Sequence, residues 1–172
     1  MKKQEIKTEL LINGSKVVFG HQFIEDIVGC IPDIKENQAI FSLLAKSDNL
    51  DVRESISTKD NLSKKTIHLL LDDESQEVVD TILSNSNSTK KINEDNLLII
   101  IKSDNVKYLT TIAKNLEKYA LCNIGKIAHI LCNHKNASVR YSLVQYSTYY
   151  GIIKKLSKDK DFDVAKVAKE EL

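Results

Sequence analysis

The hydrophobic and polar positions of this chain follow one arrangement that recurs five times. Each occurrence can be aligned on one residue. Apolar residues stand eleven and eight positions before this aligned residue, and another apolar residue stands four positions after it. A short polar residue stands three positions before the aligned one. The aligned residues are Val52, Val78, Tyr108, Val139 and Val164, and the polar residues are Asn49, Ser75, Asn105, Asn136 and Asp161. Such an internal repeat is typical of stacked supersecondary units.

Each repeat predicts two short helices joined by a polar turn. Apolar positions three apart share one helical face, so the residues eleven and eight positions back define the first helix. Asn, Ser and Asp are favoured N-cap residues because their side-chain oxygens accept a free N–H of the first helical turn. The second helix is expected to begin directly after the polar residue. Besides the aligned residues, the core columns are Phe41, Ile67, Leu97, Ala128 and Ile153; Leu44, Leu70, Ile100, Leu131 and Leu156; and Ile56, Ile82, Ile112, Leu143 and Ala168.

The spacing between successive repeats varies. The aligned residues are 26, 30, 31 and 25 positions apart. The extra residues are expected in loops between repeats, where insertions cost little, and residues 84–89 are the clearest such loop. An ordinary irregular helical bundle with coincidental periodicity stays an alternative.

The first 38 residues lack the repeat and are expected to cap it, because the end of a stack exposes an apolar face. A helix is expected over residues 23–28, with Gly29 as its stop. A second helix is expected to start with Pro32 in its first turn and to end near Leu44. The pair Asn13-Gly14 lies between apolar runs, which favours a β-hairpin, but it could equally end a helix that starts at Lys3.

Bulk composition describes an ordinary globular chain. Of its 172 residues 42% are hydrophobic and 28% charged, and the net charge of +1 is not typical of an obligate nucleic-acid binder. The longest apolar run, residues 97–101, is too short to span a bilayer, and the N-terminus lacks a secretory signal. Cys30, Cys122 and Cys132 suggest no disulfide framework. A cytoplasmic protein is expected, and the abundance of Lys, Ile and Asn is typical of AT-rich bacterial genomes.

Two segments resemble the Asp-x-x-Val-Arg core of HEAT-like repeats. They are residues 48–53, Asp-Asn-Leu-Asp-Val-Arg, and residues 135–140, Lys-Asn-Ala-Ser-Val-Arg. The longer stretch from Leu43 to Ser63 is similar to the bacterial leucine-rich repeat variant, and the similarity extends from about Gln38 to the C-terminus. This resemblance implies an α-helix and a shorter, often 3₁₀-like helix per repeat, stacked into a right-handed superhelix. It implies almost nothing about activity.

The chain departs from the family pattern in two ways. The motif arginine is present as Arg53 and Arg140 only, and Val79, Leu109 and Ala165 replace it elsewhere. The resemblance therefore implies no continuous arginine ladder. One member of the variant family also carries a cysteine-bound iron–sulfur cluster near its N-terminus, but only Cys30 lies in that region here, where four clustered thiolates are needed.

Metal-binding residue types gather at one place in the sequence, namely Cys122, His129, Cys132 and His134. Their spacing matches no zinc signature, and Cys132 falls in an apolar column, where a thiol behaves as a small hydrophobe; whether they bind a metal stays open. A cysteine nucleophile needs a nearby histidine with a third group to orient it, and none is set up locally. The chain also lacks a phosphate-binding glycine loop and the common hydrolase motifs. No catalytic residue, metal or cofactor is therefore predicted.

Lysine pairs and late tyrosines are the other candidate contact residues. The pairs Lys64-Lys65, Lys90-Lys91 and Lys154-Lys155 would grip phosphates if they lined one surface, but they occupy different positions within their repeats. Tyrosine is enriched in protein interfaces. The candidate partner-binding residues are Arg53, Arg140, His68, His129, Tyr141, Tyr146, Tyr149 and Tyr150.

The sequence thus predicts an all-α, right-handed α-solenoid of about five irregular two-helix repeats with an N-terminal cap. We expect a single domain over residues 1–172, with the cap at 1–38 and the repeats at 39–172. The expected function is a non-catalytic protein–protein interaction module or scaffold that presents a curved surface. The alternative is a HEAT-like protein that binds nucleic acid through the lysine pairs, and an enzyme or metalloprotein comes third.

Overall fold

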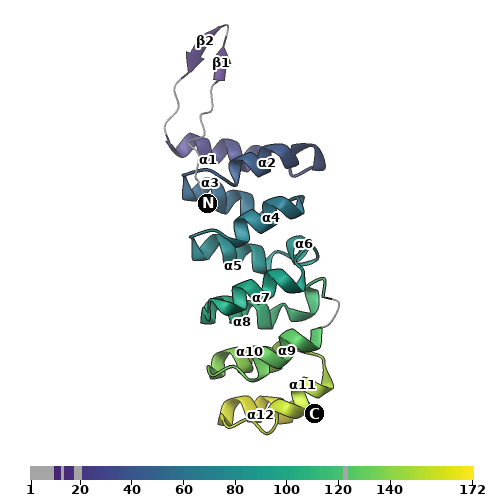
Figure 1. Cartoon of the computed structure of the whole chain (residues 1–172). Helices are drawn as coiled ribbons and strands as arrows, with labels where there is room; N and C mark the ends of the chain where they lie inside the picture. Colours follow the sequence, from purple (N-terminus) through teal and green to yellow (C-terminus); the bar gives the residue numbers. More distant parts are fainter. Residues whose placement is uncertain (1–9, 13, 18–20, 122–123) are drawn as a thin grey trace. The chain divides into compact units, whose positions relative to one another are not determined.

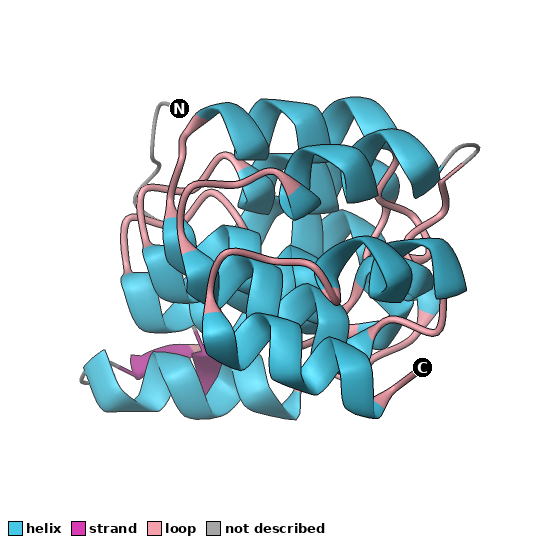
Figure 2. Cartoon of the chain, turned by 90° about the horizontal axis from the view of Figure 1, so that it is seen from below, coloured by secondary structure: helices cyan, strands magenta, loops and turns pink. Residues whose placement is uncertain are grey.

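The computed structural model describes residues 10–12, 14–17, 21–121 and 124–172, and this part of the chain is almost entirely helical (Figures 1 and 2). The chain forms two compact units, Met1–Asn87 and Ser88–Leu172. Two contact-dense units occur in single repeat domains as well as in pairs of domains, so the expected single domain stays a prediction. Among the described helices, none is long and apolar enough to cross a membrane.

The N-terminal end of the first unit contains a β-hairpin, which decides between the two alternatives at Asn13-Gly14. Strand β1 (Leu10–Ile12) pairs antiparallel with β2 (Ser15–Val17), with Leu10 opposite Val17 and Ile12 opposite Ser15. Gly14 has a φ of 81°, a conformation that glycine adopts without steric cost. Asn13 lies outside the described residues.

Helices α1 (His21–Cys30) and α2 (Gln38–Leu44) differ in their bounds from the prediction. Gly29 does not stop α1, which continues by one residue. Pro32 does not start a helix either: a 3₁₀ turn at Lys35–Asn37 precedes α2. The physical reason is the carboxylate of Asp33, which accepts the backbone N–H groups of Asp60 and Asn61 at 2.6 and 2.9 Å and so holds this segment against a later loop.

The remaining helices of the first unit are α3 (Leu50–Ser57), α4 (Lys64–Leu71) and α5 (Gln76–Ser84), followed at its boundary by the one-turn helix α6 (Ser86–Thr89). Helices α1, α3 and α5 contact one another in that order, and α2 contacts α4. The expected open loop at residues 84–89 is wrong in part, because α6 forms there and buries Ser88 and Thr89.

The second unit contains α7 (Glu94–Lys102), α8 (Val106–Lys114), α9 (Ile124–Cys132), α10 (Ala137–Tyr146), α11 (Tyr150–Leu156) and α12 (Phe162–Glu170), with a 3₁₀ turn at Leu116–Lys118. Helices α8, α10 and α12 contact one another in order, as do α7, α9 and α11. Each helix also contacts its sequence neighbour, so this unit has two layers of helices.

The predicted N-caps are confirmed at all five positions. Helices α3, α5, α8, α10 and α12 each follow a capping residue in extended conformation, and its side chain accepts a backbone N–H of the first turn. In α12, for example, Asp161 accepts the N–H groups of Asp163 and Val164. Each such cap stabilises its helix by about 1 kcal/mol.

The predicted core columns are also confirmed. Every residue of the four columns is buried except Tyr108, which is half-buried. The first helix of each pair contributes the columns that include Phe41 and Leu44, and the second contributes those that include Val52 and Ile56. The hydrophobic effect therefore acts on the faces that the spacing predicts.

Substitution of Leu70 by Ala tests this core. Leu70 is fully buried in α4, so we expect the free energy of unfolding in urea to fall by about 2–5 kcal/mol. Leu43→Ala is the control, because Leu43 is about half exposed on α2 of the same unit. A loss below about 1 kcal/mol for Leu70→Ala would contradict the core assignment.

Candidate functional site

Arg53 and Arg140, expected on a partner-facing ridge, are buried. They are 1% and 3% exposed and occupy the fourth position of α3 and α10. The Nε of Arg53 donates to Oδ2 of Asp73 at 2.8 Å and its Nη2 to Oδ1 at 3.2 Å. Arg140 makes the same two-point contact with Asp159, at 2.7 and 2.8 Å.

The remaining Nη1 groups bind main-chain carbonyls of the turn that precedes the same helix. Nη1 of Arg53 donates to the carbonyls of Ser47 and Asp48, at 2.9 and 3.1 Å. Nη1 of Arg140 donates to the carbonyls of the two residues at the equivalent positions, 134 and 135, at 2.7 and 3.2 Å. The partner-facing role predicted for the two arginines therefore needs correction, because both guanidinium groups are enclosed and bound to their own chain.

Each of the two aspartates also stabilises the start of the helix that follows it, α5 after Asp73 and α12 after Asp159. Oδ1 of Asp73 accepts the N–H of the cap residue Ser75, and Oδ1 of Asp159 accepts that of Asp161, both at 2.8 Å. The hydrogen bond from Arg140 lowers the pKa of the Asp159 carboxyl, although partial burial opposes the shift. Each arginine thus joins the turn of its own helix pair to the turn of the following pair.

The two predicted surface histidines lie on different units. His68 is exposed on α4, the helix whose first turn carries Lys64 and Lys65. His129 is exposed on α9 in the second unit. The two histidines are therefore candidate contact residues of two different units.

His129 lines an apolar pocket between α9 and α11, with a volume of about 270 Å³. The lining brings together residues that the sequence suggested for three different reasons: His129 and Cys132 as metal-type ligands, Tyr149 as an interface residue, and Lys155 as a phosphate-binding residue. The other lining residues are Ile124, Gly125, Ala128, Gly151 and Ile152.

Both lysines of α11 have defined contacts, and Lys155 lines this pocket. Nζ of Lys155 donates to Oδ1 of Asn133 at 3.0 Å, and Nδ2 of Asn133 donates to the carbonyl of His129 at 2.7 Å. Nζ of Lys154 lies 5.7 Å from the centre of the Tyr150 ring, a cation–π distance. Positive charge and exposed aromatic surface therefore lie side by side on α11.

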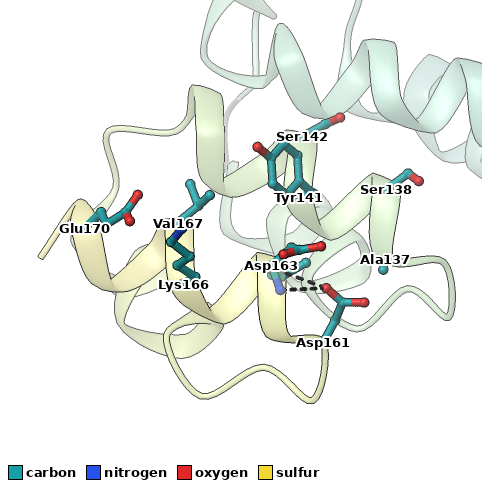
Figure 3. A pocket seen from close by; sticks show the side chains of 10 residues that line it. Ala137, Ser138, Tyr141, Ser142, Asp161, Asp163, Lys166, Val167 and Glu170 are labelled. Atoms are coloured by element: carbon teal, nitrogen blue, oxygen red, sulfur yellow. Dashed lines mark hydrogen bonds between the residues drawn. The ribbon is translucent and has the colours of Figure 1, made fainter.

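The four late tyrosines divide between two surfaces. Tyr146, Tyr149 and Tyr150 are 51%, 46% and 62% exposed and lie where α10 ends and α11 begins. Tyr141 is half-buried and belongs to a separate open groove between α10 and α12 (Figure 3). We call the pocket, Tyr146, Tyr149, Tyr150 and Lys154 the α9–α11 surface.

The α10–α12 groove, of about 620 Å³, has a mixed charged lining. Ser138, Tyr141 and Ser142 come from α10, and α12 contributes the charged side chains of Asp163, Lys166 and Glu170 (Figure 3). The Asp161 carboxylate at its edge caps α12. Opposite charges on one helix give this groove no clear preference for a charged ligand.

A groove of the first unit is acidic. It has a volume of about 740 Å³ and is lined by α1, α3 and α5. Four carboxylates line it, those of Asp26, Asp51, Glu54 and Glu77, and no Lys or Arg is among its described lining residues. An acidic cluster of this kind is equally expected of a solvated helix face.

The remaining metal-type residues do not form a cluster with His129. His134 accepts the N–H of Asn136 at Nδ1, and its Nε2 lies 2.8 Å from Oδ1 of Asp104, which also binds Lys135. No group of three or more potential metal ligands is found within the described ranges. Cys122 lies outside them.

The Cys132 thiol is poorly suited to nucleophilic chemistry. Burial raises its pKa, although Lys155 partly opposes this effect. A protonated thiol is a weak nucleophile, so the structure offers no activated cysteine at the pocket.

The three lysine pairs lie on separate elements. Lys64 and Lys65 begin α4, Lys90 and Lys91 follow α6, and the third pair belongs to α11. The sequence signal that was missed is the charge of the two units. Residues 88–172 contain 15 Lys and Arg against 9 Asp and Glu, whereas residues 1–87 contain 10 against 15. The net charge of +1 therefore conceals a basic and an acidic half.

No protein-family model matches the chain, and comparisons with curated proteins and with solved structures found no significant similarity.

The substitution Asp159→Asn tests the buried ion pair. It removes the carboxylate charge but keeps an oxygen that can accept the N–H of Asp161. Because it leaves the Arg140 guanidinium buried without a counter-charge, we expect a loss of about 3 kcal/mol at pH 7 in urea unfolding.

The loss should shrink in acid. The folded-state pKa of Asp159 is lowered, so the carboxylate stabilises the wild type above about pH 4, and this contribution disappears as the pH falls through the folded-state value. Asp163→Asn, at an exposed carboxylate of the same helix, is the control. Equal losses for Asp159→Asn at about pH 7 and pH 3 would show that charge is not the cause.

Proposed function

We propose that this chain is a non-catalytic α-solenoid of the leucine-rich repeat variant or HEAT-like type that binds another protein through the α9–α11 surface. The observation that carries the proposal is an apolar pocket lined by Tyr149 and Lys155. The exposed Tyr150 and Lys154 lie on the same helix, α11, and the exposed Tyr146 ends α10. Protein interfaces commonly combine an aromatic and apolar centre with a polar rim.

The order in which the helices contact one another supports a solenoid within each unit. In an α-solenoid each repeat contacts its neighbours, first helix to first helix and second to second. The rows α1–α3–α5 and α8–α10–α12 follow this order. The five caps are equivalent, and two of the junctions between successive pairs carry the same contact, Arg53–Asp73 in the first unit and Arg140–Asp159 in the second.

The chemistry of the pocket favours binding over catalysis. Its thiol has a raised pKa, and the described hydrogen bonds place no carboxylate against the His129 ring to orient it as a base. The side chains that line the pocket are of the kinds common in protein interfaces: the ring of Tyr149, the aliphatic groups of Ile124 and Ile152, and the ammonium group of Lys155, which Asn133 holds by a hydrogen bond.

Nucleic-acid binding is the second candidate. The basic excess of residues 88–172 favours it, because phosphate contacts require clustered Lys or Arg. The spread of the lysine pairs over separate elements is against it, since a backbone-binding stripe needs several cations along one track.

The decisive test is affinity capture with a variant that adds a bulky side chain to the pocket lining. Gly151 lines the pocket from α11, and a Cβ built there meets no atom within 4 Å, so Gly151→Leu begins from a position with open space. Gly29→Leu is a matched control at another helical glycine with open space, which lines the acidic groove. Both variants should be at least as stable as wild type, because glycine is a poor helix former.

We expect nuclease-treated lysate of the source cells to yield a protein that the wild type and Gly29→Leu retain and that Gly151→Leu loses. Retention by Gly151→Leu would contradict the assigned surface, whether or not Gly29→Leu also binds. Recovery of nucleic acid alone, lost on nuclease treatment or at raised salt, would favour the second candidate.

A further inference from the structure

We propose that the α9–α11 pocket accepts one large apolar side chain from an acidic segment of the partner protein. This inference rests on the proposed function and deepens it by stating the chemistry of the partner. Three features of the pocket carry it: its size, its lining and the charge around it.

The size of the pocket suits a side chain better than a whole metabolite. Small-molecule sites usually have volumes of about 300–1,000 Å³, and this pocket, at about 270 Å³, is below that range. It is also open to solvent, and Tyr149 in its lining is about half exposed. A short stretch of extended chain can therefore pass over the pocket and insert one residue.

The lining suits an apolar group. Ile124, Ala128 and Ile152 contribute hydrocarbon surface, and Ala128 and Ile152 are themselves buried. The edge donors and acceptors of a nucleobase packed against these three side chains would stay unpaired, and unpaired buried polar groups are costly. An aliphatic or phenyl side chain loses no hydrogen bond on entry.

The charge of the pocket lining and of α11 favours an acidic segment, and the Glu117 carboxylate near Tyr149 is already bound by Ser147 and Thr148. Lys155 lines it, its Nζ held by Asn133, and Lys154 lies over Tyr150 on the next turn. No Asp or Glu is present among the residues described as lining the pocket. Carboxylates on either side of the inserted residue would meet these ammonium groups, and such complementarity selects partners and speeds association.

The tyrosines provide the rim. Tyr149 and Tyr150 are exposed at the first turn of α11, and tyrosine offers a large contact area with only two side-chain torsions to fix. Together the rim and the pocket account for exposed aromatic surface that has no role in the core of the unit.

The experiment is a fluorescence-anisotropy titration of the full chain with a labelled peptide of about ten residues. The probe carries one phenylalanine flanked on both sides by aspartate and glutamate. Two control probes replace the phenylalanine by serine, or the acidic residues by lysine. Burial of a phenyl group is worth about a 10- to 100-fold change in affinity, so the serine probe should bind weaker by that factor.

The variants should respond in a set order. Gly151→Leu should abolish binding of the acidic probe, and Gly29→Leu should leave it unchanged. The double substitution of Lys154 and Lys155 by Gln should weaken binding several-fold and flatten its salt dependence. The lysine probe should not bind measurably.

Four results of the titration would overturn the inference. Two concern the probes: equal binding of the acidic and basic probes, or no binding of the acidic probe at a millimolar concentration of the chain. The third is binding of the acidic probe that survives Gly151→Leu. The fourth is displacement of the probe by single-stranded oligothymidylate at a lower concentration than the unlabelled acidic peptide requires. The last would make nucleic acid the ligand. If affinity capture yields a pocket-dependent partner while the acidic probe fails, only the partner chemistry is wrong, and the proposed function stands.

A second copy of the chain is the remaining occupant to test. Phe162 is 78% exposed between Asp161 and Asp163, so another molecule could offer the same chemistry. Sedimentation velocity should show a monomer for the wild type. A dimer that both Phe162→Ser and Gly151→Leu abolish would overturn the inference in favour of self-association.

Discussion

The turn before each second helix is the constraint on which the structure depends. At all five turns the residue two positions before the N-cap accepts the backbone N–H of the cap residue, while the cap side chain accepts an N–H of the helix. The accepting residues are Ser47, Asp73, Ser103, His134 and Asp159. These paired bonds satisfy main-chain groups that the change of direction would otherwise leave free. They fix where the first helix stops and the second begins.

The arginines build on this turn. Where the accepting residue is an aspartate, its second oxygen is available, and the arginine of the preceding pair occupies it. Serine and histidine at the equivalent positions lack a carboxylate for this contact. At His134 the neighbouring pair is joined differently, through Asp104, which binds both His134 and Lys135. Val79 and Leu109 stand where the motif has arginine. In each case the helix pair that follows has an accepting residue that is not acidic, Ser103 after Val79 and His134 after Leu109.

Helix α11 has a buried side and an exposed side. The buried residues of α11 are Ile152, Ile153 and Leu156, which pack into the core of the second unit. Its exposed residues include Tyr150 and Lys154, which form a cation–π contact, and Lys155, which lines the apolar pocket.

The sequence by itself determined the local structure. The five caps follow from side-chain oxygens such as those of Asn49 and Asp161, and the core columns and the helical register follow from the spacing of apolar residues along one helix face. These depend on residues within about a dozen positions of each other. Tertiary structure decided the rest. It buried Arg53 and Arg140 against aspartates that lie about twenty residues further along the chain. It also brought His129 of α9 into the same pocket lining as Tyr149 and Lys155. Burial and convergence depend on which elements pack together, and a linear pattern does not contain that information.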